Sequence, residues 1–223
     1  MTDTQMDQFL EEFYRLSILS YLKDEGVLDH GELELFDWYL KVGEHNIDEM
    51  LKGYIDEDSL VLVDYYIDRV RHSHVFHLTS LVEKSLRRAT EWLELRHRVK
   101  FDPNKGGRWK WQKRLEFLKN GGFSDIDDGT WHTLDVLIQT RNILAHPNAP
   151  QRPELDSTTT KRHSELEKLA QKIGSTPGIK VDHGMVVIGS DFARHCLIAF
   201  TAFSKHVDCQ IQQSFKSLNR NVH

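Results

Sequence analysis

The chain has 223 residues, 39% hydrophobic and 28% charged, so it is long enough to bury a core and is not disordered in composition. No apolar run approaches the ~18 residues of a membrane span, and the acidic N-terminus lacks the basic and apolar regions of a signal peptide. The only two cysteines, Cys196 and Cys209, make no disulfide framework, so we expect a cytoplasmic protein without a membrane partner.

The net charge of -5 conceals an uneven distribution along the chain. Residues 1–70 hold 18 Asp and Glu against 5 Lys and Arg, whereas residues 84–119 hold 12 Lys and Arg against 4 acids. The basic segment 84–119 has two interpretations: an internal counterpart to the acidic N-terminal third, or a surface for an anionic partner such as RNA. Aromatic residues between the cations favour the second: Trp92, Trp109, Trp111 and Phe117.

Apolar residues recur at helical spacing through most of the chain, which predicts an all-α fold. The first expected helices cover residues 4–23, 32–42, 46–52 and 58 or 59 to about 95. The third of these is a short helix opened by Asn46 and Glu49 as a capping pair. The later ones cover 109–119, about 129 to Pro147, 158–173, and 190 or 191 to near the C-terminus.

Two short runs rich in β-branched residues, 179–181 and 185–188, flank Asp182-His183-Gly184 and predict a small β-hairpin. We therefore interpret residues 1–223 as one domain, an all-α bundle with this hairpin near residues 179–188. Within it, residues 1–57 form acidic N-terminal helices and residues 58–223 form the core helices.

Two clusters contain metal-binding residue types: His72, His74 and His77 in the long helix, and His195, Cys196, His206 and Cys209 in the last one. In the first cluster only two histidines share a helix face, which is too few for a zinc site. In the second, the two pairs lie roughly 15 Å or more apart along one helix. We expect no metal and no other cofactor, and Cys196 is expected in the core.

The segment Arg141-Asn142-Ile143-Leu144-Ala145-His146-Pro147 places an Arg and a His with four residues between them at the end of an amphipathic helix. The spacing alone is weak, because roughly one such pair is expected by chance in this composition, and Arg69 with His74 fits it too. The context is more specific. Asn142 follows the Arg, Pro147 follows the His, and Gly121-Gly122-Phe123 precedes the helix.

In these features residues 122–147 resemble the HEPN superfamily, whose nucleases carry an Arg, four to six residues and then a His. The resemblance implies a helical bundle in which two protomers join two Arg/His sets in one cleft and cleave RNA without a metal. It also implies roles for the matching residues. His146 would be the general base or acid, Arg141 the phosphate clamp and Asn142 an orienting or phosphate-binding group, with Glu83 in the long helix as a secondary candidate.

The local geometry is compatible with these roles. Asn142 and His146 are one helical turn apart, and Pro147 disfavours helical geometry at His146. On a straight helix Arg141 and His146 lie about 140° apart, so the pair of one protomer does not converge. Other interpretations remain open. Arg141 could instead form a salt bridge with Asp135, Asp127 or Glu83, and His146 could cap the helix.

Apolar residues on more than one face of residues 131–147 predict a two-fold homodimer. The expected function is a HEPN-type, metal-independent endoribonuclease in toxin–antitoxin or anti-phage defence, with an antitoxin or other regulatory protein as a further partner. Its RNA contacts are expected from Arg108, Lys110, Lys113 and Arg114. The first alternative is a non-catalytic HEPN module that binds RNA or a protein. The second is a helical adaptor whose acidic N-terminal third binds a basic partner.

Overall fold

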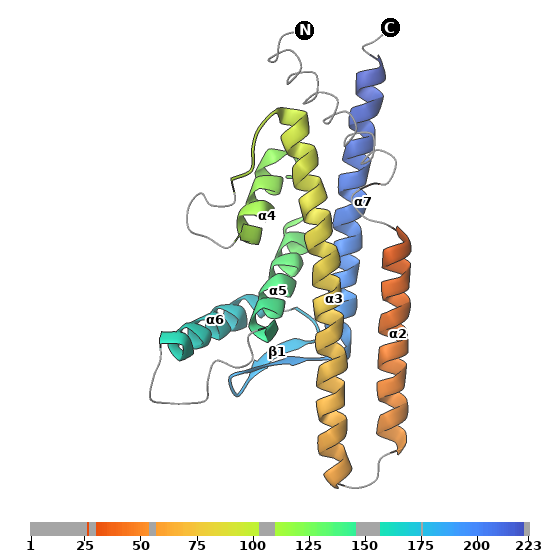
Figure 1. The fold of residues 1–223 in the computed structure, drawn as a ribbon, viewed down its shortest axis with the longest axis vertical. Coiled ribbons are helices and arrows are strands. Elements are labelled where there is room, and N and C mark those ends of the chain that lie inside the picture. Colours follow the sequence, from red (N-terminus) through yellow and green to blue (C-terminus); the bar gives the residue numbers. More distant parts are fainter. Residues whose placement is uncertain are drawn as a thin grey trace, which may run out of the picture. The chain divides into compact units, whose positions relative to one another are not determined.

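The structure, a computed structural model, describes Gly26 and residues 30–53, 57–102, 110–145, 157–174 and 176–220. In these ranges the elements are α2 (His30–Gly53), α3 (Glu57–His97), α4 (Lys110–Gly121), α5 (Asp128–Ala145), α6 (Ser157–Ile173), β1 (Ile179–Asp182), β2 (Met185–Ile188) and α7 (Ser190–Arg220) (Figure 1). The predicted all-α fold with a small hairpin is confirmed. The helix expected at 4–23 lies outside the described residues. No helix in the described ranges combines the length and apolarity needed to cross a bilayer.

Helix α2 is continuous, so the prediction of two helices over 32–42 and 46–52 is wrong. Its buried residues Phe36, Leu40 and Ile47 keep helical spacing through the expected break. Asn46 is exposed within the helix and does not cap a new one. The burial of one apolar stripe along the whole of α2 therefore outweighs the local capping signal of Asn46 and Glu49.

Gly43 allows α2 to approach α3 closely. A Cβ atom at this position would lie 2.7 Å from Nε2 of His74, so any larger residue would collide with the imidazole. His74 is only 1% exposed, and its ring meets Tyr39 edge-on at 4.9 Å. Burial lowers the pKa of His74, which favours the neutral imidazole in the folded protein. His74 is therefore part of the buried contact between α2 and α3.

The chain divides into two compact units, which are described separately. The hairpin unit comprises residues 33–80 and 129–200, and the α4 unit comprises residues 1–32, 81–128 and 201–223. Helices α2, α3, α5 and α7 contribute residues to both units. A single domain over residues 1–223 stays a prediction.

In the hairpin unit, α2 runs antiparallel to the first half of α3 (Figure 1). Phe36 packs against His77 with ring centroids 5.1 Å apart, and the Tyr39 hydroxyl lies 2.9 Å from Oγ of Ser73. Helix α6 lies against β1. Helix α5 is buried on several sides, since Trp131, Leu134, Val136, Leu137, Ile138 and Ile143 are all in the core.

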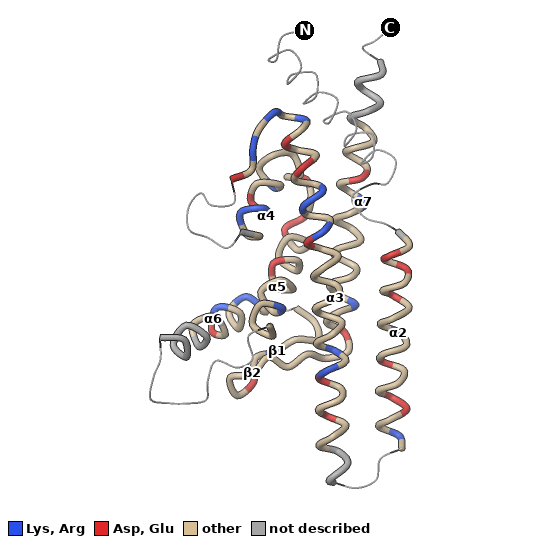
Figure 2. The backbone as a smooth tube through the Cα atoms, viewed as in Figure 1, with Lys and Arg blue, Asp and Glu red and all other residues tan. Residues whose placement is uncertain are grey.

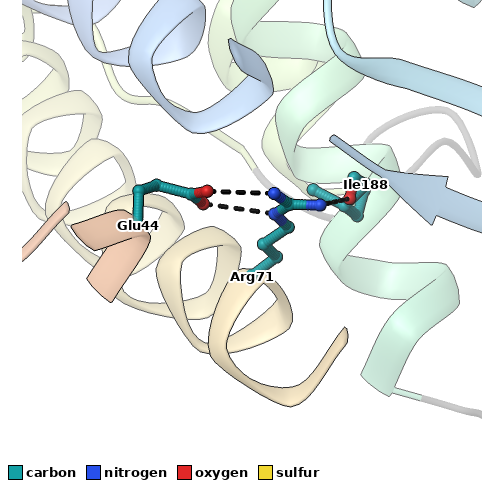
Figure 3. A network of polar contacts seen from close by, with 3 residues as sticks. All are labelled: Glu44, Arg71 and Ile188. Carbon is teal, nitrogen blue, oxygen red and sulfur yellow. Dashed lines mark hydrogen bonds and ion pairs between the residues drawn. The ribbon is translucent and has the colours of Figure 1, made fainter. Parts of the chain in front are cut away.

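Arg71 links three elements of the hairpin unit (Figure 3). Its Nη2 and Nε donate to the two carboxylate oxygens of Glu44 on α2, at 2.9 and 3.2 Å. Its Nη1 donates to the carbonyl of Ile188 at the end of β2, at 3.4 Å. The paired geometry suits the planar guanidinium, so one side chain of α3 holds both α2 and the hairpin.

The hairpin has the predicted position and a two-residue turn. Ile179 pairs with Ile188 and Asp182 with Met185, which leaves His183 and Gly184 to reverse the chain. Both have positive φ, 46° and 73°, as a type I′ turn requires. At the open end, the amide of Gly189 donates to the carbonyl of Gly178 at 2.6 Å.

In the α4 unit, the second half of α3 packs with α4 and the segment after it. Trp92 and Phe123 have ring centroids 5.6 Å apart, and Phe101 and Phe117 5.3 Å. Glu94 accepts a hydrogen bond from the amide of Phe101 at 2.6 Å, which fixes the chain as it leaves α3. The helix expected over 109–119 is α4, and it ends at Gly121.

Candidate functional site

The described part of the candidate site lies in the last two turns of α5. Arg141 and Asn142 are both half-buried there, and Nη1 of Arg141 donates to Oδ1 of Asn142 at 3.0 Å. This bond restricts the guanidinium, because it ties a long side chain to its neighbour. It also uses the amide oxygen of Asn142, so the NH₂ group is the part of that side chain that can donate to a substrate or to His146.

Arg141 is paired with no carboxylate among the residues that the structure describes. Asp135, one of the partners considered from the sequence, instead binds Nζ of Lys172 at 2.6 Å and accepts from Gln139 at 2.9 Å. The polar contact described for Arg141 is its bond to Asn142, so the other two candidates, Asp127 and Glu83, are not its partners among the described residues. The charge of Arg141 is therefore not neutralised by any described acidic side chain.

His146 and Pro147 lie outside the described residues, so the relation of His146 to Arg141 and Asn142 stays a prediction. Helix α5 is described through Ala145, the residue immediately before His146. Asn142 lies within this helix, four positions before His146 in the sequence.

The apolar faces of α5 are buried within the single chain. Trp131, Leu134, Val136, Leu137, Ile138 and Ile143 are core residues, and the apolar residues of α5 that reach solvent, Leu144 in part and Ala145, lie in the last turn. A second copy is therefore not needed to cover these faces, and the surplus of apolar residues is no longer an argument for association. The homodimer stays a prediction that now rests on the resemblance alone.

Figure 2 shows Lys and Arg gathered over the second half of α3 and over α4. Several of these cations are occupied within the α4 unit. Lys84 binds Glu32 at 2.7 Å, and Arg96 stacks over Trp92 at 5.0 Å. Because Glu32 belongs to the acidic N-terminal third, Lys84 fits the interpretation of the basic segment as an internal counterpart.

Arg114 is half-buried within the α4 unit, where its side chain packs against an aromatic ring. Its guanidinium lies 5.3 Å from the ring centroid of Phe101. Burial lowers the pKa of Arg114, as does Arg87, whereas three acids oppose the shift: Glu91, Glu94 and Glu83. The secondary candidate Glu83 therefore acts electrostatically on Arg114.

Of the other three predicted RNA contacts, the structure describes the side chain of Lys113 alone. Arg108 and the side chain of Lys110 lie outside the described residues. Lys113 is half-buried on α4 and interacts with other groups of the chain. An RNA surface formed by these residues stays a prediction.

The two cysteines have different environments. Cys196 is in the core, as predicted, and burial raises the pKa of its thiol, whereas Cys209 is exposed and accepts a hydrogen bond from Gln213 at 3.3 Å. His195 shares a hydrogen bond of 3.3 Å with Oγ1 of Thr133 on α5, a contact that no motif indicates. Within the described ranges, no three His, Cys, Asp or Glu side chains come together as a metal site would require.

Comparisons of the chain with protein-family models, with curated proteins and with solved structures give no significant match.

Proposed function

We propose that the protein is a metal-independent endoribonuclease of the HEPN type that cleaves RNA at a site shared by two copies of the chain. The observation that carries this proposal is Arg141, a half-buried cation with no described carboxylate partner, restricted by Asn142 in the turn that leads to His146 and Pro147. A guanidinium held in this way is suited to binding a phosphate group.

The proposed reaction uses groups of the chain and of the RNA itself. His146 of one copy takes the proton of a ribose 2′-OH, and the oxygen attacks the adjacent phosphorus. The bond to the 5′-oxygen breaks, and that oxygen leaves with a proton from the histidine of the second copy. Arg141 stabilises the charge that develops on the phosphate, and the NH₂ group of Asn142 binds a phosphate oxygen or orients His146. Two copies are invoked because Arg141 and His146 lie about 140° apart on a straight helix.

Cleavage of single-stranded RNA by the purified full chain in excess EDTA is the test. We expect products with a 2′,3′-cyclic phosphate and a 5′-OH, and no cleavage of DNA of the same sequence, because DNA lacks the attacking hydroxyl. Mass spectrometry of the products distinguishes a cyclic phosphate from a 3′-OH. RNA binding without cleavage at any salt concentration or pH would instead favour the non-catalytic HEPN module.

The setting of this activity is part of the same proposal. The resemblance favours toxin–antitoxin or other anti-phage defence, in which an antitoxin or regulatory protein holds the nuclease inactive until it is needed. RNA is the substrate in this proposal, and a second copy of the chain is the first partner.

The basic segment is expected to contribute to RNA binding through cations of residues 108–113. Charge reversal of Arg108, Lys110 and Lys113 to Glu should weaken RNA binding and lower the slope of log Kd against log salt by about 2, since each phosphate contact contributes roughly 0.7 for a single strand. Arg114 is left unchanged because it stacks on Phe101. Fluorescence anisotropy with a labelled RNA measures both quantities.

The matched control reverses two exposed lysines of α2, Lys41 and Lys52, each of which pairs with an acid in its own helix. This control should leave the salt slope unchanged. If the triple variant binds RNA with the affinity and slope of the wild type, the basic segment is an internal counterpart to the acidic N-terminal third.

A further inference from the structure

Helix α2 has a second apolar stripe besides the one that faces the core. Leu35, Trp38 and Val42 follow one another at spacings of three and four, so they share one face of the helix. Leu35 is 62% exposed and Trp38 is 59% exposed, and Val42 is half-buried. An exposed tryptophan beside an exposed leucine is unusual for a helix that has already buried its core stripe.

Helix α3 carries a matching stripe along its first half. Leu62, Tyr65, Arg69, His72 and Phe76 recur at alternating spacings of three and four, over about 21 Å of helix. Leu62 is 71% exposed and Tyr65 is 59% exposed. The guanidinium of Arg69 lies over the Tyr65 ring at 4.9 Å, so this cation contributes a flat, stacked surface to the stripe.

The two stripes lie on the same side of the helix pair. Residues two apart in a helix point about 160° away from each other. Glu44 follows Val42 by two residues and Arg71 follows Arg69 by two, and Glu44 and Arg71 together join the pair to β2 (Figure 3). Both stripes therefore point away from the rest of the hairpin unit, and we call them together the outer face.

The two stripes also lie at the same height along the antiparallel helix pair. Phe36 contacts His77 and Tyr39 contacts Ser73, so α2 and α3 are antiparallel, and Trp38 lies at the level of Phe76. The outer face is thus a two-helix apolar surface of the kind that accepts a third helix.

The outer face has acidic residues at its two edges and one cation, Arg69, within the α3 stripe. Glu34 on α2 and Asp68 on α3 are exposed and form no salt bridge with any described residue. The exposed lysines of α2 are occupied, because Lys41 binds Asp37 at 2.6 Å and Lys52 binds Glu49 at 2.7 Å. Negative charge is therefore left over at both edges of an apolar surface.

This charge distinguishes between the possible occupants. A second copy would bring the same two acidic edges against each other, with only one Arg69 in each copy to offset two carboxylates. The chain's own first 29 residues hold 7 Asp and Glu against 2 Lys and Arg, so they would be repelled as well. A cationic helix satisfies both the apolar stripes and the acidic edges.

We propose that the outer face is the docking site for a basic amphipathic helix of a protein partner. The apolar side of that helix packs on Trp38, Tyr65 and Phe76, and its Lys or Arg side chains reach Glu34 and Asp68 at the two edges. This interaction is independent of the proposed nuclease activity, because the outer face contains neither Arg141 nor Asn142.

The test uses a labelled 21-residue synthetic peptide with Leu at the first and fourth positions of each heptad and Lys and Ala elsewhere. We expect saturable 1:1 binding to the full chain by fluorescence anisotropy. A scrambled peptide of the same composition should bind at least about tenfold more weakly, because its apolar residues no longer form one stripe. A peptide with every Lys replaced by Glu should not bind.

Variants of the outer face locate the binding. Replacing Trp38 and Tyr65 together with Ala should weaken binding of the amphipathic peptide by about tenfold or more, as loss of central aromatic contacts does. Replacing Glu34 and Asp68 with Lys should weaken it and reduce its salt dependence. The matched controls are Met185→Ala, an apolar residue 62% exposed on the hairpin, and Asp125→Lys, an exposed acid of the α4 unit. Neither control should change the affinity.

Three outcomes would overturn the proposal. They are equal affinity for the scrambled peptide, unchanged affinity in the Trp38/Tyr65 variant, and conversion of a dimer to a monomer by that variant in sedimentation velocity. The last result would assign the outer face to a second copy of the chain. The substituted side chains are exposed, so thermal unfolding close to that of the wild type is expected and verifies that each variant is folded.

Discussion

The His146→Ala variant is expected to cleave RNA roughly 10²–10⁴-fold more slowly than the wild type, the usual range for loss of a general acid or base. Arg141→Ala should lose about 10²–10³-fold, because one charged donor to a developing oxyanion contributes about 3–4 kcal/mol. Asn142→Ala should cost less, since it orients or binds a group and transfers no proton. Single-turnover rates with saturating enzyme measure these effects on the chemical step.

The controls for these variants are taken from similar residues elsewhere. His132 is an exposed histidine on the same helix, and Arg69 belongs to the second Arg-x4-His pair, in the middle of α3. His132→Ala and Arg69→Ala should cleave RNA at the wild-type rate. His74 is unsuitable, because it is buried against Tyr39 and its loss would disturb the packing of α2 on α3.

Growth of bacteria that express the chain is a second measurement of the same activity. The wild type should slow growth, and His146→Ala should relieve the effect. If His146→Ala equals the wild type in both growth and cleavage, the nuclease proposal is wrong and the non-catalytic HEPN module replaces it.

Gly178→Ala is expected to lower the free energy of unfolding by at least about 3 kcal/mol, because two penalties coincide at this position. Gly178 has a φ of 72°, a conformation that costs an L-residue about 1–2 kcal/mol. A Cβ there would also lie 2.3 Å from the amide nitrogen of Phe192, at the start of α7. The clash is with backbone, so no side-chain rotation relieves it. Urea denaturation followed by circular dichroism measures the change.

Gly184→Ala separates the two penalties. Gly184 has nearly the same φ, 73°, but a Cβ there would meet no atom within 4 Å. This variant should therefore lose only about 1–2 kcal/mol, the conformational penalty alone. Equal losses in the two variants would mean that the approach of Gly178 to α7 is not tight.

Local signals were sufficient where the structure depends on neighbouring residues. The hairpin was predictable because two β-branched runs flank a turn whose second residue is Gly184, and positive φ at that position favours glycine. The ends of α4 and α5 follow from Gly121-Gly122 and from Pro147 in the same way.

Features that depend on tertiary contact were not predictable. Gly43 is consistent with either a helix break or a close helix crossing, and only the position of His74 decides between them. The apolar surplus of α5 suggested a dimer because nothing in the sequence shows that one chain buries every one of those faces.

In the candidate site, too, contacts between neighbouring residues were predictable and contacts between distant residues were not. The bond between Arg141 and Asn142 joins adjacent residues, and its two members were identified from the motif. The pairing of Asp135 with Lys172 joins residues 37 apart, so the sequence could not exclude Asp135 as a partner of Arg141. The stacking of Arg114 on Phe101 likewise depends on how the segment after α3 returns to α4.

The contacts of Arg71 also have a consequence for the order of folding. Its bond to Glu44 closes a loop of 27 residues, whereas its bond to the carbonyl of Ile188 closes one of 117. The entropy of loop closure rises by about 0.6 kcal/mol for each doubling of length, so the longer loop costs about 1.3 kcal/mol more. We expect α2 and the first half of α3 to associate early, while the hairpin docks late onto a guanidinium that Glu44 has already oriented.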